Sequence, residues 1–142
     1  FERIKANPNM TYHGYQPNEV VREALQKAHI FAYPSIWQET SCIAAIEAMS
    51  AGCAIVCPNY AGLPETTANF AFEYQYSEDT QQHVNIFANA MSTVIDMVNN
   101  NDQSMQTRLA IQKNYTDTFY NWDKRAKEWE GLIRGILRAQ KA

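Results

Sequence analysis

The sequence lacks the features that mark three common classes of protein. It has only three cysteines, Cys42, Cys53 and Cys57, and no Cys-x-x-Cys pair, so a disulfide framework and a zinc site are both disfavoured. Its formal net charge of −3 argues against a nucleic-acid-binding face. Its apolar runs are all far shorter than the roughly 20 residues that a transmembrane helix needs. These absences favour a protein of a reducing, intracellular compartment, which we expect to be the cytoplasm.

The length of 142 residues is compatible with one domain that has a sizeable core. No signal-peptide pattern opens the chain, and its first residue is Phe1 rather than methionine, as in a fragment. No internal repeat or linker divides it. We therefore expect a single domain over residues 1–142 that is part of a longer protein.

A strand, a helix and a second strand are predicted between residues 30 and 57. Residues 30–33 and 53–57 are apolar runs that each end at a proline, which is typical of buried strands. Residues 43–51 between them have a helical pattern that ends at a glycine. Such a unit places ligands in the crevice beyond the carboxyl ends of its strands. The loop that contains Glu39 is expected to lie at that end.

Glu47 is conspicuous because its neighbours in the predicted helix are almost all alanine, isoleucine or methionine. A helix that is apolar on all sides is normally buried, and a buried carboxylate is costly unless a group donates hydrogen bonds to it. One interpretation is that Glu47 faces water or pairs with an arginine for structural reasons. The other is that a pair of ligand hydroxyls donates to it, while the unpaired N–H groups of the helix start hold a phosphate.

The order of these residues resembles the signature of the large retaining glycosyltransferase family 4. The matching positions are Pro34-Ser35, Glu39, Glu47-Ala48-Met49 and Ala51-Gly52, followed by an apolar strand. Residues 61–65, Ala-Gly-Leu-Pro-Glu, resemble that family's Gly-Gly-x-Pro-Glu loop. The resemblance covers almost the whole chain. It implies an α/β fold with a Rossmann-like, three-layer α/β/α parallel sheet. The chain would be the later part of the C-terminal, donor-binding domain of a GT-B glycosyltransferase, without the N-terminal acceptor domain.

The resemblance also implies roles for individual residues. Glu39 would be the catalytic carboxylate, which bonds a hydroxyl of the donor sugar. The amides of Ser41, Cys42 and Ile43 would face sugar hydroxyls and the distal phosphate. Glu47 would accept from the ribose 2′ and 3′ hydroxyls, which suits a carboxylate because it can take two hydroxyl donors from a diol at once.

The second loop would contribute Gly62 and Glu65 to the same donor site. Gly62 permits the turn of this loop, and Glu65 would help to shape the sugar pocket. Glu65 also has a purely structural interpretation, as a carboxylate in the first turn of a helix. Most relatives have Gly-Phe-Gly after the first glutamate, whereas residues 40–42 are Thr-Ser-Cys here. This departure bears on which sugar fits, more than on whether a diphosphate fits.

The activity implied by the resemblance is transfer of a glycosyl group from a nucleotide diphosphate sugar with retention of the anomeric configuration. The acceptor would be a glycan, a lipid or a small molecule. The resemblance also implies that no metal or other cofactor is needed, because helix amides and basic side chains replace it. The sequence agrees, since no His, Cys and Asp cluster has metal-ligand spacing. Peripheral association of the whole protein with the inner membrane face is left open. So are two alternatives: a nucleotide-sugar epimerase or phosphorylase on the same scaffold, and a non-catalytic module that binds a nucleotide or a partner.

Relatives use an arginine and a lysine from earlier in this domain to neutralise the diphosphate, and no matching pair precedes the motif here. Stabilisation of developing charge is usually the largest catalytic term. We therefore expect the whole protein to be a hexosyltransferase-type enzyme, and the 142-residue chain alone not to be competent for transfer.

The remaining elements are predicted from hydrophobic spacing and turn residues. A strand is expected over residues 9–13, and alternating aromatic residues predict another over residues 70–76. Helices are expected over residues 19–27 with Asn18 as the N-cap, from 77–79 to about 99, over 103–120, and from the N-cap Asn121 onwards. His83 is expected in solvent, and Arg134, Arg138 and Lys141 suit the dipole at the end of the last helix.

Overall fold

The computed structural model describes residues 2–140, so the expectation for Lys141 and the outer ends of the expected domain lie outside it. Its helices are α1 (Glu2–Lys5), α2 (Asn18–Lys27), α3 (Ile43–Ala51), α4 (Leu63–Thr66), α5 (Thr80–Asn99), α6 (Gln103–Phe119) and α7 (Trp122–Ala139). Its strands are β1 (Ile30–Ala32), β2 (Ala54–Pro58) and β3 (Phe72–Tyr74).

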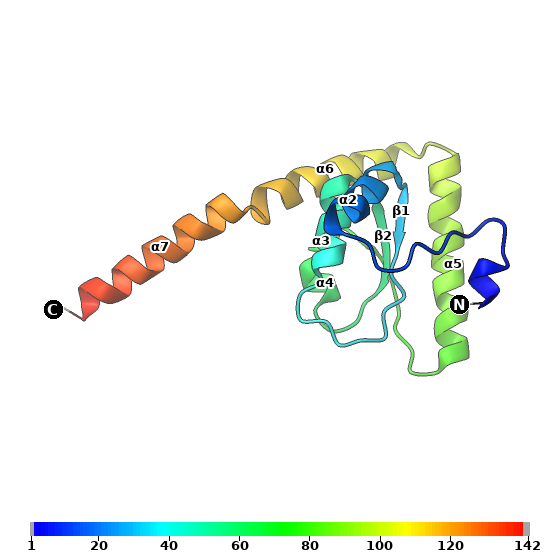
Figure 1. Cartoon of the computed structure of the whole chain (residues 1–142), viewed down its shortest axis with the longest axis horizontal. Helices are drawn as coiled ribbons and strands as arrows, with labels where there is room; N and C mark the ends of the chain where they lie inside the picture. The colour runs from blue at the N-terminus through cyan, green and yellow to red at the C-terminus, as the bar shows by residue number, and fades with distance from the viewer. Residues whose placement is uncertain (1, 141–142) are drawn as a thin grey trace.

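The strands form one parallel sheet with the order β1-β2-β3. In the register, Ala54 of the central strand pairs with Ile30 of β1, and Val56 pairs with Phe72 of β3. Helix α5 packs on one face of the sheet and α3 on the other (Figure 1). The three layers confirm the predicted α/β fold with a Rossmann-like parallel sheet.

Strand β2 is buried along its whole length because both faces of the sheet are covered. Ile55 belongs to the apolar cluster that contains Met49 of α3. Val56, which points to the opposite face, belongs to the cluster that contains Val94 of α5. Parallel strands that are buried on both faces are continuously apolar, and this explains why the sequence reveals β2 so clearly.

The predicted strand–helix–strand unit is confirmed. Helix α3 has the bounds that the sequence predicts, Ile43–Ala51. It ends at Gly52, whose φ of 89° lies in the left-handed region that favours glycine. Strands β1 and β2 lie on either side of it in the sequence, with each end within a residue of the prediction.

The strand predicted over residues 9–13 is wrong. These residues form no strand and are exposed, and β1 pairs only with β2 in the part of the chain that the structure describes. A strand needs a neighbour for its backbone hydrogen bonds. Residues 9–13 have the side chains of a strand but no such neighbour within residues 2–140, so they remain irregular.

His83 is buried rather than solvated, which corrects the prediction. Only 5% of its surface is exposed, and its Nε2 lies 3.0 Å from the hydroxyl of Tyr74. Tyr74 ends β3 and also packs on Phe87, one turn after His83 in α5. The side of α5 that carries these two residues therefore faces the sheet.

Helix α6 packs on α3, whereas α7 leads away from the rest of the chain (Figure 1). Asn121 caps α7 as predicted, because its side-chain oxygen accepts from the Lys124 N–H at 3.2 Å. No residue of α7 is buried. Its exposed large apolar residues are Trp122, Trp129, Leu132, Ile133, Ile136 and Leu137. Within residues 2–140, no helix combines the length and the apolar character that crossing a membrane requires.

Candidate functional site

Two loops meet beyond the carboxyl ends of β1 and β2. The Gly62 N–H of the second loop donates to the carbonyl oxygen of Glu39 in the first, at 2.8 Å. A Cβ atom on Gly62 would lie only 2.6 Å from the Thr40 carbonyl oxygen. Gly62 is therefore required for close backbone approach. The turn itself does not require it, since Gly62 has a φ of −82° and the positive φ of 50° belongs to Ala61.

Glu39 is half-buried and is held by Tyr33. The Tyr33 hydroxyl donates to Glu39 Oε1 at 2.6 Å, and the Tyr33 ring stacks on Phe31 of β1. The pKa of Tyr33 is raised, chiefly by this hydrogen bond to Glu39 and then by burial. Tyr33 consequently stays protonated and orients one oxygen of the carboxylate, so that the other oxygen can accept from a ligand.

The start of α3 is only partly open to a ligand. The Cys42 N–H donates weakly to Thr66 Oγ1 of α4 at 3.4 Å, and Cys42 is buried. Ser41 is exposed, and Ile43 is 70% exposed. Of the three residues whose amides are predicted to face a ligand, Ser41 and Ile43 therefore lie at the surface, whereas the Cys42 amide is directed to α4.

Glu47 is half-buried, and its partner is a neutral side chain. Asn18 Nδ2 donates to Glu47 Oε1 at 3.0 Å across 29 residues of sequence. No ion pair within residues 2–140 involves Glu47. Of the two structural interpretations of this carboxylate, pairing with an arginine is thus wrong. The prediction that Asn18 caps α2 is also wrong, because Asn18 is the first residue of that helix and Pro17 precedes it as the N-cap.

Glu47 lies in the wall of a cleft of about 1080 Å³ between α2, α3, the end of α6 and the start of α7. Ser41 and Ile43 also line this cleft, whereas Glu39, Cys42, Gly62 and Glu65 do not. Its other polar and charged members are Arg22, Gln26, Ser50, Lys113, Thr116, Asp117, Tyr120, Asn121, Asp123 and Arg125. The predicted site residues therefore fall into two groups, one around Glu39 and one around Glu47, which the start of α3 connects.

The cations of the cleft are not equally available. Lys113 pairs with Asp117 at 3.0 Å, and Arg125 pairs with Glu128 at 2.8 Å. Arg22 of α2 has no carboxylate within ion-pair distance in residues 2–140. The cleft can thus accept hydroxyl donors at Glu47 and attract an anionic group at Arg22.

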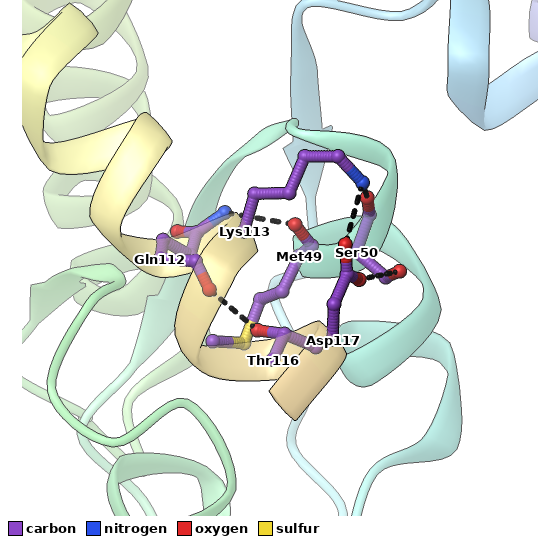
Figure 2. A network of polar contacts seen from close by, with 6 residues as sticks. All are labelled: Met49, Ser50, Gln112, Lys113, Thr116 and Asp117. Carbon is purple, nitrogen blue, oxygen red and sulfur yellow. Dashed lines mark hydrogen bonds and ion pairs between the residues drawn. The ribbon is translucent and has the colours of Figure 1, made fainter. Parts of the chain in front are cut away.

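A polar network joins α3 to α6 along this cleft (Figure 2). The Gln112 side chain, fully buried, donates to the carbonyl oxygens of Cys53 at 2.9 Å and Met49 at 3.5 Å. Asp117 accepts from the Ser50 hydroxyl at 2.5 Å, and this bond is the main reason that its pKa is lowered. Carbonyl groups at the end of α3 thereby find donors. Sequence patterns do not reveal the network, since its bonds between the α3 region and α6 join residues that lie 59 to 67 positions apart.

Glu65 lies exposed in the first turn of α4. A carboxylate there is favoured by the helix dipole, so its position agrees with the structural interpretation and leaves the ligand role a prediction.

Sequence reasoning also missed Tyr33 and Asn18 as partners of the two key glutamates. Tyr33 lies at the end of a predicted strand and Asn18 at the start of a predicted helix, and polar residues at such positions are too common to be singled out. Within residues 2–140, no three or more His, Cys, Asp or Glu side chains are grouped so as to hold a metal ion.

Comparison with known proteins identifies the family. The model of the glycosyl transferases group 1 family matches residues 2–113, which is well over half of the chain. The matched range includes both loops, the sheet and both glutamates, and it ends before α7. Neither the curated proteins nor the solved structures gave a match. The chain therefore belongs to the group 1 glycosyltransferases.

Proposed function

We propose that this chain supplies part of the donor site of a retaining glycosyltransferase, which transfers a glycosyl group from a nucleotide diphosphate sugar. The acceptor is a glycan, a lipid or a small molecule. The family match supports a glycosyl-transfer domain. The nucleotide diphosphate sugar as donor and the retention of the anomeric configuration go beyond that match and are our proposal.

One observation carries the proposal: Glu47 lines a large cleft and bonds a neutral amide instead of a cation. A carboxylate can accept about four hydrogen bonds, and a single N–H occupies one of these sites. The remaining sites can accept both hydroxyls of a vicinal diol, such as those of a ribose. An arginine partner would have occupied both oxygens in a bidentate pair.

Glu39 serves the other end of the donor in this proposal. Its backbone is held by Gly62 and its Oε1 by Tyr33, so its free oxygen has a defined position. A carboxylate that accepts from a sugar hydroxyl orients the sugar ring relative to its leaving group. The gain is one of positioning, because the reacting atoms must be aligned before transfer. No proton transfer is assigned to either glutamate.

Binding of nucleoside diphosphates tests the nucleotide half of the proposal. Titration calorimetry of the purified protein with UDP, GDP and ADP should show binding to at least one of them. Glu47→Gln should weaken that binding about tenfold, since hydrogen bonds to a charged group contribute about 1.5–3 kcal/mol. Glu23→Gln, which neutralises an exposed carboxylate of α2, is the matched control and should bind as the wild type does. Equal affinities for the two variants would contradict the assignment.

Product analysis of the whole protein tests the catalytic half. The anomeric configuration of the product, read by NMR, should equal that of the donor. Glu39→Ala should abolish transfer while leaving nucleoside diphosphate binding in place. Unchanged activity in Glu39→Ala would instead favour a module that binds nucleotides without catalysis. Cosedimentation with lipid vesicles tests separately whether the whole protein associates peripherally with membranes.

A further inference from the structure

We propose that Asn18 is a positioning residue for Glu47, and that it sets the preference of the site for ribonucleoside over 2′-deoxyribonucleoside diphosphates. This inference rests on the proposed function. It goes beyond it by naming a residue that acts on the ligand through another side chain, and by naming the part of the ligand that this residue selects.

Asn18 is free for this task because the start of α2 does not use its side chain. The N-cap of α2 is Pro17, whose carbonyl oxygen accepts from the N–H groups of Val20 and Val21. An asparagine at a helix start commonly caps the helix, but here no side-chain cap bond exists. The Asn18 amide reaches Glu47 on α3 instead, and so connects the two helices that form one side of the cleft.

The chemistry of an amide suits the orientation of a ligand-binding carboxylate. Asn18 is neutral, so it holds Glu47 without cancelling the charge that strengthens hydrogen bonds from a ligand. It occupies one acceptor site of Oε1 and leaves all of Oε2 open. A glutamate side chain otherwise moves among many rotamers, and the ordering of such a side chain weakens binding. Because Oε1 is fixed, the plane of the Glu47 carboxylate is also fixed. A diol that donates to both carboxylate oxygens needs this defined plane.

The preference for ribose follows from that geometry. A vicinal diol donates twice to an oriented carboxylate, whereas a 2′-deoxyribose donates once. If the carboxylate is free to rotate, it loses more of the two-point interaction than of the one-point interaction. Removal of the Asn18 amide should therefore weaken binding of the ribonucleotide more than binding of the deoxyribonucleotide.

The experiment is calorimetric titration of UDP and dUDP, or of the GDP or ADP pair if that base binds best, into the wild type and the variants. We expect Asn18→Ala to lower the affinity for the ribonucleotide about fivefold, and that for the deoxyribonucleotide less than twofold. Asn18 acts on the ligand only through the orientation of Glu47, so its loss removes only part of the contribution of a hydrogen bond to a charge. In a Glu47→Gln background, Asn18→Ala should have almost no further effect, since coupled residues are not additive.

Asn18→Asp separates positioning from helix stability. This variant has nearly the same shape, but it places a second carboxylate against Glu47. Its affinity for the nucleoside diphosphate should fall about twentyfold at pH 8. Part of this loss should be recovered near pH 5, where the carboxyl pair takes up a proton. At the first position of a helix, however, an aspartate is favoured by the dipole. Thermal unfolding near pH 5, where the carboxyl pair shares a proton, should therefore show no loss of stability, whereas repulsion from Glu47 should cost some stability at pH 8. A merely structural Asn18 would give no pH-dependent binding.

The possible results distinguish the two proposals. If nucleoside diphosphates bind through Glu47 and the Asn18 variants bind like the wild type, this inference is wrong and the proposed function stands. Equal losses for ribonucleotide and deoxyribonucleotide would also overturn it, since orientation of Glu47 would not then select the diol. If no nucleoside diphosphate binds to the wild type, the proposed function fails and this inference fails with it.

Discussion

Helices α3 and α7 both carry apolar side chains that a helix would bury, but the rest of the described chain covers only those of α3. Helix α3 is buried at Ala45, Ala48 and Met49, between the sheet, α2 and α6. Helix α7, which leads away from the rest of the chain (Figure 1), has no buried residue, although tryptophan, leucine and isoleucine recur along it at helical spacing. An apolar stripe thus predicts that a helix has a face to bury, but not what covers it.

The two helices consequently depend on different interactions. Helix α3 is held by apolar packing and by donors from α6, such as Gln112. Helix α7 is held locally, by the Asn121 cap and by an exposed pair in which Arg134 lies 2.6 Å from Glu130. Exposed pairs of this kind contribute about 0.3–0.5 kcal/mol. The global stability of the described chain should therefore be sensitive to changes at α3 and insensitive to changes at α7.

The largest expected effect is that of Met49→Ala in α3. Met49 is fully buried in the core between α3 and β2. Its truncation should lower the free energy of unfolding by about 2–5 kcal/mol, as is usual for a large apolar residue replaced by alanine in a core. Urea denaturation measured by circular dichroism gives this value. Ile136→Ala in α7 is the matched control, and an equal loss there would contradict the comparison.

The next effect is that of Gln112→Ala in α6, which removes a donor from the Met49 carbonyl at the end of α3 and from the Cys53 carbonyl just after it. The buried Cys53 carbonyl would lose its side-chain donor, whereas the Met49 carbonyl would still accept from the Gly52 N–H, so the free energy of unfolding should fall by about 2 kcal/mol. Gln106→Ala, at an exposed position of the same helix, should change it by less than about 0.5 kcal/mol. Similar values for the two glutamines would show that the network does not hold α6 on α3.

A smaller loss of stability is expected at alkaline pH, because strand β2, on which α3 packs, contains the buried thiol of Cys57. Burial is the main cause that raises the pKa of Cys57, from 9.0 to about 12. Above pH 9 the unfolded chain releases this proton while the folded chain keeps it, so stability falls as pH rises from 9 towards 12. The loss attributable to Cys57 should be about 1 kcal/mol at pH 10 relative to pH 8.

Cys57→Ala tests that assignment, since it should flatten the alkaline decline in urea denaturation. A residual decline is expected from Tyr74, whose pKa burial raises to about 12. The assignment would be refuted by a wild type and a variant with the same slope. Helix α7, which has no buried residue, should contribute nothing to this pH dependence.

The smallest effect is that of Trp129→Gln in α7, where the side chain is 64% exposed. Exposed substitutions usually change the free energy of unfolding by less than about 0.5 kcal/mol. A loss above about 1 kcal/mol would mean that Trp129 is covered in solution. Sedimentation analysis at several concentrations would then show whether a second copy of the chain covers it.

Local patterns were sufficient for the two central strands and the helix between them, and insufficient for which surfaces meet when the elements pack. The apolar runs that become β1 and β2, and the helix between them, have the bounds that sequence predicts to within a residue. Residues 9–13 have an equally plausible strand pattern and form none, because a strand also needs a neighbour. His83 was expected in solvent, since nothing local shows which side of α5 faces the sheet.

The candidate site shows the same contrast between residues that a local pattern reveals and residues that only the packing identifies. Glu39 and Glu47 stand out in the sequence, because one follows a predicted strand and the other interrupts an apolar helix. Tyr33 and Asn18, which hold them, do not stand out. Asn18 was instead assigned to the cap of its own helix, because a local hydrogen bond is the only one that a local pattern can suggest.

The sequence by itself determined the α/β class, the strand–helix–strand unit and the two carboxylates, because each depends on side chains within about ten positions of one another. Only the tertiary structure decided that Glu47 bonds a neutral amide, that Gln112 holds the end of α3, and that α7 stays uncovered within the described residues. These outcomes depend on which surfaces meet when the elements pack. Residues far apart in the sequence make those contacts, and no local spacing encodes them.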